Sequence, residues 1–119
     1  MSSTGAEDRP VDLDHLAVYT GGDQALNAEI LSLFLDQAAS LIRQLQSVLE
    51  AGDQKVWRET NHALKGAARG IGAFALADAA AVAEPLPLAQ SAADAVVALE
   101  ALNKRMGAVQ LFIEAYLGR

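Results

Sequence analysis

Three stretches of this 119-residue sequence carry apolar residues at steps of three and four, the spacing that places side chains on one face of an α-helix. They cover residues 24–51, 54–84 and 91–116, and a shorter stretch of the same kind covers residues 12–19. The sequence is also rich in alanine and contains only three prolines, a composition that favours helix. Because helices of such length must bury their apolar faces against one another, the fold class is expected to be all-α.

The ends of the long stretches carry residues typical of helix caps. Asp23 and Asp53 stand where side-chain caps are expected for the first two long helices, and Gly52 fits the position that ends the first. Ser91 and Asp94 have the spacing of a capping box at the start of the last helix, with aspartate in place of glutamate or glutamine. These residues predict where the long helices begin and end.

The middle stretch is the least regular of the three. Pro85 and Pro87 stop it, because proline cannot continue a helix. Its apolar stripe steps from Ile71 to Leu76, which is five residues rather than three or four. We therefore expect one long helix with a bend or phase slip near residues 70–73.

Long helices joined by short connections predict an antiparallel up-and-down helical bundle with a short N-terminal helix. Residues 11–119 are expected to form this one domain, and the polar residues 1–10 are expected to form a flexible N-terminal segment. The residues predicted to face the core follow the helical spacing and are Leu13, Leu16, Val18, Leu26, Ile30, Phe34, Ala38, Leu41, Leu45, Val48, Trp57, Leu64, Ile71, Leu76, Val96, Leu99, Leu102, Met106, Val109, Ile113 and Tyr116.

The composition argues against several functions. A net charge of −6 disfavours nucleic acid as a partner, because a phosphate backbone needs a basic face. The absence of cysteine removes disulfides, thiolate catalysis and zinc–thiolate sites. The sequence opens with no signal-peptide pattern, and no apolar run is judged long enough to span a membrane, so a cytoplasmic protein without membrane contact is expected. Gly21-Gly22 lacks the lysine and the other glycines of a phosphate-binding loop and predicts only a turn.

His62 is predicted to point away from the core of the middle helix. On a helical wheel, Leu64 lies at about 200° and Ile71 at about 180° from it. Four of the nine basic residues of this acidic chain therefore lie around one exposed histidine. The neighbours within two helical turns are Lys55, Arg58, Glu59, Lys65, Gly66 and Arg69.

Three residues in this group suit phosphoryl transfer with a partner. An exposed imidazole is largely neutral near pH 7 and can act as a nucleophile, which gives His62 a possible role. Lys65 could neutralise phosphoryl oxygens as a point charge. Gly66 costs roughly 1 kcal/mol relative to alanine inside a helix, and on an exposed face this cost is explained by the close approach of another macromolecule to the imidazole.

Each of these features also has an ordinary interpretation. A lone surface histidine is usually a solvated polar residue, and a basic cluster is often only a charged helix face. Glycines in an alanine-rich helix can allow tight contact between helices, which is the role expected of Gly70 and Gly72. The combination around His62 is less ordinary than any one part.

A metal-binding bundle is the first alternative. Glu59 and His62 have the i, i+3 spacing used in di-iron bundles, and Asp12 and His15 form a weaker pair of the same kind. Such sites need ligands that point into the bundle, whereas His62 is predicted to point outward among cations. We therefore predict no metal site, and His15 is expected to be a surface residue.

The segment 62–68, His-Ala-Leu-Lys-Gly-Ala-Ala, is followed by Gly-Ile-Gly-Ala at residues 70–73. It closely resembles the signature H-x-L-K-G-[SA]-[SA] and the glycine-containing I-G-A segment of histidine-containing phosphotransfer (HPt) domains. The resemblance extends to almost the whole chain through weaker matches at Asp12-Leu13, Gly22-Asp23, Phe34 and Glu84, the last of which falls where the family usually has a leucine–glutamate pair.

The resemblance implies an HPt-type four-helix bundle and assigns roles to individual residues. His62 would be the phosphoacceptor, Lys65 would assist the phosphoryl group, and Gly66 would clear space for the partner. The residues expected at the docking surface are Arg58, Glu59, Gly66 and Arg69. Arg69 and Gly70 depart from the family pattern, which often has a small residue and then a polar one such as asparagine.

The resemblance also implies a phosphocarrier rather than an enzyme with its own ATP-binding or kinase domain. A response-regulator receiver domain would supply the aspartate and Mg²⁺, so no cofactor of its own is expected, and a hybrid histidine kinase is the other expected partner in a two-component phosphorelay. A monomer is expected. The remaining alternatives are a helical adaptor that is not phosphorylated and a kinase dimerisation domain, which would need a partner helix and an attached ATP-binding domain.

Overall fold

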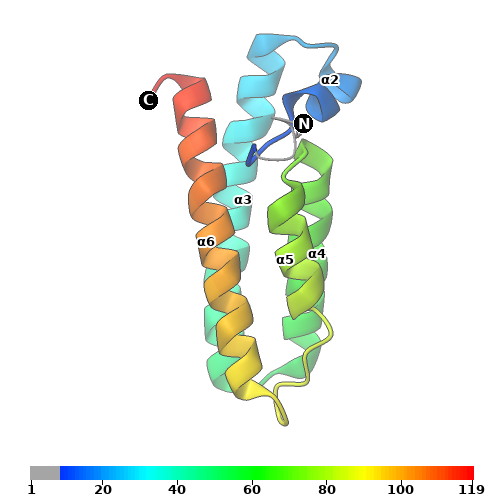
Figure 1. Cartoon of the computed structure of the whole chain (residues 1–119), viewed down its shortest axis with the longest axis vertical. Coiled ribbons are helices and arrows are strands. Elements are labelled where there is room, and N and C mark those ends of the chain that lie inside the picture. The colour runs from blue at the N-terminus through cyan, green and yellow to red at the C-terminus, as the bar shows by residue number, and fades with distance from the viewer. Residues whose placement is uncertain (1–8) are drawn as a thin grey trace, which may run out of the picture.

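The computed structural model describes residues 9–119, and this part of the chain consists of helices without a strand. The helices are α2 (Leu13–Thr20), α3 (Gln24–Ala51), α4 (Gln54–Ile71), α5 (Phe74–Ala83) and α6 (Ala92–Leu117). The four longer helices lie side by side, and each contacts two of the others, so that α3, α4, α5 and α6 close a ring (Figure 1). The predicted all-α antiparallel bundle with a short N-terminal helix is confirmed.

The expectation of one long helix over residues 54–84 is wrong, although the irregularity lies where the sequence placed it. α4 ends at Ile71, and Gly72 adopts a left-handed conformation with φ of +83°. The Ala73 N–H then donates to the Ala68 carbonyl at 2.8 Å, which completes a glycine C-cap. The chain therefore reverses rather than bends, and α5 packs antiparallel along α4 (Figure 1). Leu76 is buried, as expected.

Gly72 also fixes the N-terminal part of the domain. The Asp12 N–H donates to the Gly72 carbonyl at 2.9 Å, and a Cβ on Gly72 would lie only 2.6 Å from the Asp12 carbonyl oxygen. Gly72 thus allows a close contact, but with the segment before α2 rather than between two helices of the bundle. A Cβ on Gly70 would meet no atom within 4 Å, so the tight-contact role expected of Gly70 is wrong.

The N-terminal segment enters the fold just before α2. Val11 is fully buried, whereas Arg9 and Pro10 line a surface pocket with Leu76 and Arg105. Residues 1–8 of the predicted flexible segment 1–10 lie outside the described residues. α2 lies across the end of the bundle at which α4 turns into α5 (Figure 1).

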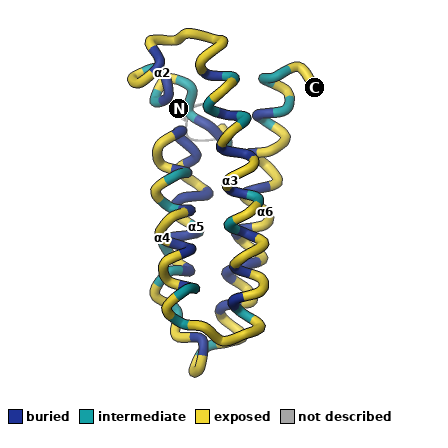
Figure 2. Tube along the Cα trace, turned by 180° about the vertical axis from the view of Figure 1, so that it is seen from behind, coloured by how far each residue is buried: buried dark blue, intermediate teal, exposed yellow. Residues whose placement is uncertain are grey.

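The buried residues line the inner sides of α3–α6 (Figure 2). Most predicted core positions are buried or half-buried, and Trp57 is among the largest side chains that solvent does not reach. Three predictions are wrong, because Val18, Leu26 and Val96 are exposed. Asn27 takes the inward position beside Leu26, where it joins a polar network that links α2, α3 and α6.

The buried polar groups of this network are paired by hydrogen bonds, as the burial of an amide requires. The Thr20 hydroxyl donates to Asn27 Oδ1 at 2.6 Å, and Asn27 Nδ2 donates to the Tyr116 hydroxyl at 3.2 Å. The two predicted aspartate caps are confirmed, since Asp23 and Asp53 each accept a backbone N–H three residues later. The capping box at Ser91 is not formed, because the Ser91 side chain makes no cap hydrogen bond.

α3 is, by length and composition alone, apolar enough to cross a membrane, with a window of mean hydropathy 1.2. The expectation that no apolar run reaches spanning length is therefore wrong for this helix. The finding is weak evidence for a membrane segment, because the core helix of a soluble bundle passes the same test and α3 packs against α4 and α6.

Candidate functional site

His62 lies at the middle of α4, on the side of the helix that faces away from the core. Its side chain is 70% exposed, whereas Asn61 and Leu64 beside it in sequence are fully buried. The outward orientation predicted from the helical wheel is confirmed. An imidazole in this position is accessible to a macromolecule as well as to a small reagent.

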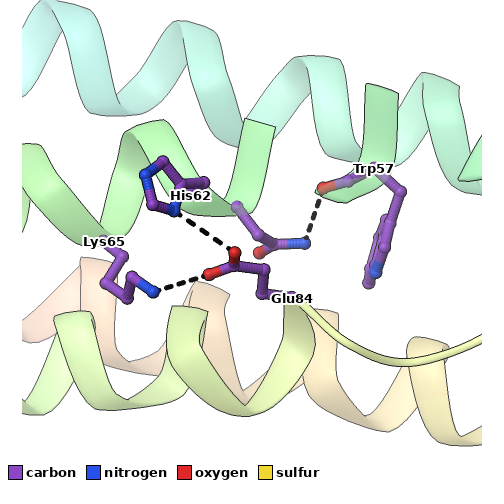
Figure 3. Close-up of polar contacts among 5 residues, drawn as sticks. Trp57, His62, Lys65 and Glu84 are labelled. Atoms are coloured by element: carbon purple, nitrogen blue, oxygen red, sulfur yellow. Dashed lines mark hydrogen bonds and ion pairs between the residues drawn. The ribbon is translucent and has the colours of Figure 1, made fainter. Parts of the chain in front are cut away.

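A single carboxylate from the end of α5 holds both His62 and Lys65 (Figure 3). Glu84 Oε2 lies 3.2 Å from His62 Nδ1, and Glu84 Oε1 lies 2.8 Å from Lys65 Nζ. Among the described residues, the contact between Lys65 and Glu84 is the one ion pair that does not require a protonated histidine. The Lys65 and Glu84 side chains are only 20% and 21% exposed, so this pair is better shielded from water than an ordinary surface pair.

The contact with Lys65 keeps Glu84 ionised. The Lys65 ammonium bonded to the Glu84 carboxyl is the main cause that lowers the pKa of that carboxyl below its usual value, and the hydrogen bond from His62 acts in the same direction against an opposing effect of burial. An ionised carboxylate can only accept hydrogen bonds. The Nδ1 atom of His62 must therefore carry the proton of this contact, which leaves Nε2 of the neutral ring with its lone pair.

The geometry directs that free nitrogen outward. In Figure 3 the second ring nitrogen of His62 lies on the side of the ring away from Glu84. Since the side chain is largely exposed, an electrophile can reach Nε2 from solvent. A neutral imidazole whose other nitrogen is bonded to a carboxylate is a competent nucleophile with a fixed tautomer.

The other residues predicted at the site lie on the same outer side of α4. Arg58, Glu59, Gly66 and Arg69 are all exposed. A Cβ on Gly66 would meet no atom within 4 Å, so packing within the bundle does not require glycine at this position. Arg58, Glu59 and Arg69 form no ion pair with the described residues and remain available to a partner.

Glu84 is not among the site residues predicted from the sequence, although it matches the family pattern. That match was the one signal that could have identified it. As one continuous helix, residues 54–84 would have placed Glu84 about 33 Å from His62, at 1.5 Å per residue over 22 residues. The reversal at Gly72 brings the two side chains into contact.

The metal-binding alternative gains no support from the geometry. Among residues 9–119, no three histidine, cysteine, aspartate or glutamate side chains lie close enough together to hold a metal ion. His62 contacts Glu84 rather than Glu59. His15 is half-buried and packs edge-on against Tyr19 and Phe74, with ring centroids 5.6 and 5.1 Å apart.

The fold and the site together define a helical bundle that presents one exposed imidazole, held by a carboxylate at Nδ1 and free at Nε2. The family model for the Hpt domain matches residues 29–112, which is well over half of the chain, and the protein belongs to this family. Hpt domains are phosphocarrier modules, not kinases, and they act in histidine phosphotransfer with the kinases and response regulators of two-component signalling. No curated protein and no solved structure matches the chain.

Proposed function

We propose that this protein is a phosphorelay intermediate in which His62 exchanges a phosphoryl group with the aspartate of a response-regulator receiver domain. The observation that carries this proposal is the exposed imidazole whose Nδ1 is bonded to Glu84. This contact selects Nε2 as the reacting atom. The protein is further proposed to be a cytoplasmic monomer. The ring of four helices needs no helix from a second chain, which supports the monomer.

The transfer step follows from the tautomer. The Nε2 lone pair forms a bond to phosphorus while the bond between phosphorus and the receiver's aspartate oxygen breaks, and the aspartate leaves as a carboxylate. The proton on Nδ1 stays in its hydrogen bond to Glu84, so the positive charge that develops on the ring faces a negative one. The reverse step passes through the same arrangement.

The metal ion for this chemistry is proposed to come from the receiver domain. Mg²⁺ bound there would neutralise phosphoryl oxygens during transfer. This chain offers cations instead, and the Lys65 ammonium, one helical turn from His62 and bonded to the same carboxylate as its Nδ1, is proposed to assist the phosphoryl group. Arg58 and Arg69 are exposed on the same side of α4, which suits an acidic partner and predicts association that weakens with salt.

The test is transfer of a radiolabelled phosphoryl group from a panel of phosphorylated receiver domains in the presence of Mg²⁺. We expect acid-labile label on the wild-type chain and none on His62→Gln, which removes the nucleophile from an exposed position and should keep the fold. His15→Gln is the matched control, because His15 is the other histidine of the chain, and it should take up label like the wild type.

Two results would overturn the proposal. Label on His62→Gln would place the phosphoryl group on another residue. A wild-type chain that keeps its helical circular dichroism, binds a receiver domain and takes label from none of the panel would instead be the non-phosphorylated adaptor.

A further inference from the structure

The position of Glu84 depends on how α5 is held along α4. The buried face of α5 is built mainly from alanine, with Ala77, Ala80 and Ala83 all out of reach of solvent. Burial of such small apolar side chains favours contact between the helices but is non-directional. A shift of α5 along α4 by one helical turn would move Glu84 by about 5.4 Å and break both of its contacts.

Two side chains from the first turn of α4 make directional contacts with the chain on either side of Glu84. The Trp57 indole Nε1–H donates to the Ala83 carbonyl at 2.8 Å. The Gln54 side chain bonds to the following turn at two points, since its Nε2 donates to the Leu86 carbonyl at 3.0 Å and its Oε1 accepts from the Leu88 N–H at 2.7 Å. Glu84 therefore lies between two anchored points.

We propose that Gln54 and Trp57 are positioning residues that hold Glu84 against His62, a role that rests on the proposed function of His62. Both lie on the same helix as His62, eight and five residues before it, which corresponds to about 12 and 7.5 Å along the helix axis. A single rigid element thus sets the position of the imidazole and of the anchors for its carboxylate partner. Figure 3 shows Trp57 and His62 on this helix with Glu84 facing them; the dashed line at Trp57 marks the bond from Asn61 to the Trp57 backbone carbonyl.

The local backbone shows why such anchors are needed. Glu84 keeps helical angles at the end of α5, with φ of −51°, but Pro85 and Pro87 prevent the helix from continuing. The last carbonyls of a helix have no partner within it. The Ala83 carbonyl accepts from the Leu86 N–H at 3.2 Å and, at a shorter distance, from the Trp57 indole, and the turn after Glu84 bonds to the Gln54 side chain.

The test replaces Gln54 by methionine, which has a similar length but neither donates nor accepts these hydrogen bonds. Gln37→Met is the matched control, because Gln37 is an exposed glutamine on α3. The readout is the ¹⁵N spectrum of the histidine rings in the unphosphorylated protein, which reports the tautomer of His62. His15 is the internal reference, because its ring makes no hydrogen bond to the described residues.

We expect wild type and Gln37→Met to hold His62 in the tautomer with the proton on Nδ1. In Gln54→Met the tautomer population should shift toward that of His15, and the pKa of the Glu84 carboxyl, followed by ¹³C shifts, should rise toward its usual value. The transfer rate should fall roughly tenfold, since a displacement near 1 Å can cost more than this. The far-ultraviolet circular dichroism should not change.

Trp57→Phe is the second variant and should cause the same shift in the tautomer of His62. It is measured under conditions in which circular dichroism shows that the variant is folded. An unchanged His62 tautomer and Glu84 pKa in Gln54→Met would overturn the inference, whatever the stability of the variant. A wild-type chain that takes no label would overturn the proposed function of His62, while the tautomer measurement, which needs no phosphoryl group, would still decide the positioning role.

Discussion

Substitutions of Gly66 should have opposite effects on the stability of the fold and on the docking of the partner. It lies in the interior of α4 with ordinary helical angles, and a Cβ there would meet no atom within 4 Å. Glycine in an exposed helix interior costs about 1 kcal/mol relative to alanine. Gly66→Ala should therefore raise the free energy of unfolding by about 1 kcal/mol, which corresponds to a rise in Tm of roughly 3–6 °C for a domain of this size.

Two other helical glycines provide matched controls for stability. Gly70 on α4 and Gly107 on α6 are also exposed, and a Cβ on either would meet no atom within 4 Å. Gly70→Ala and Gly107→Ala should each stabilise the fold by a similar amount, measured by thermal and urea unfolding. Gly107→Ala should leave phosphoryl transfer at the wild-type rate, because it lies on a different helix from His62.

The functional effect of Gly66 should have the opposite sign. Gly66 lies one helical turn from His62, so a larger side chain there would stand in the path of a docking receiver domain. Forcing extra methylenes into a packed contact typically costs about 1–3 kcal/mol, which is roughly a 5- to 150-fold loss of affinity. The loss of affinity for the receiver domain should fall in this range for Gly66→Leu and should be smaller for Gly66→Ala. The affinity is measured from the rate of label transfer at increasing concentrations of the receiver domain.

The results that would refute this reasoning are distinct. If Gly66→Leu transfers at the wild-type rate, close approach of the partner does not explain the glycine. If Gly66→Ala lowers the Tm while Gly107→Ala raises it, the bundle itself requires glycine at position 66 and the space around it is not free.

Three further predictions concern stability. Because Lys65 lowers the pKa of the Glu84 carboxyl below 4.5, the pair stabilises the fold above about pH 4.5, and this contribution is lost as the pH falls through the lower pKa of the folded state. Glu84→Gln should therefore lower the urea midpoint more at pH 7 than at pH 3, and an equal loss at both would contradict this. Gly72→Ala should lower the free energy of unfolding by more than about 1 kcal/mol, since φ is +83° and the Cβ would lie 2.6 Å from the Asp12 carbonyl oxygen; an unchanged urea midpoint would show that this corner relaxes freely. Asn61→Leu should raise the free energy of unfolding by about 1–3 kcal/mol, because Asn61 Oδ1 is buried without a partner among the described residues. A lower urea midpoint for this variant would count against that reasoning.

The helices themselves could be predicted because apolar spacing and capping residues involve positions that are close together in the sequence. Steps of three and four identified the inward faces of α3 and α6, and Asp23 and Gly52 identified the two ends of α3. The errors at Val18, Leu26 and Val96 have a common cause. A run with apolar residues on several faces leaves the exact direction of the buried face open, and packing against neighbouring elements decides it.

The reversal at Gly72 could not be read from spacing in the same way. Alanine-rich sequence on both sides favours helix throughout, and one glycine can be tolerated inside a helix at modest cost. What ends α4 is a left-handed conformation stabilised by a contact with Asp12, some 60 residues earlier in the sequence. Such a contact depends on tertiary structure, so a bend was the strongest prediction available from the pattern.

The same reversal divides the site into a part that the sequence could predict and a part that it could not. His62, Lys65 and Gly66 share one helix, so their spacing alone places them together. Glu84 joins them only after α5 folds back.

The charges of the completed site give a reason for the surrounding cations. In the unphosphorylated protein the Lys65 ammonium and the Glu84 carboxylate balance each other, and His62 adds no charge when neutral. In the proposed function, a phosphoryl group would bring about two negative charges to Nε2 of a ring whose Nδ1 is already bonded to an ionised carboxylate. Lys65 alone cannot balance both anions, so Arg58 and Arg69, which have no ion pair with the described residues, can supply the missing positive charge. We therefore expect these arginines to be more strongly engaged when His62 carries the proposed phosphoryl group than when it does not.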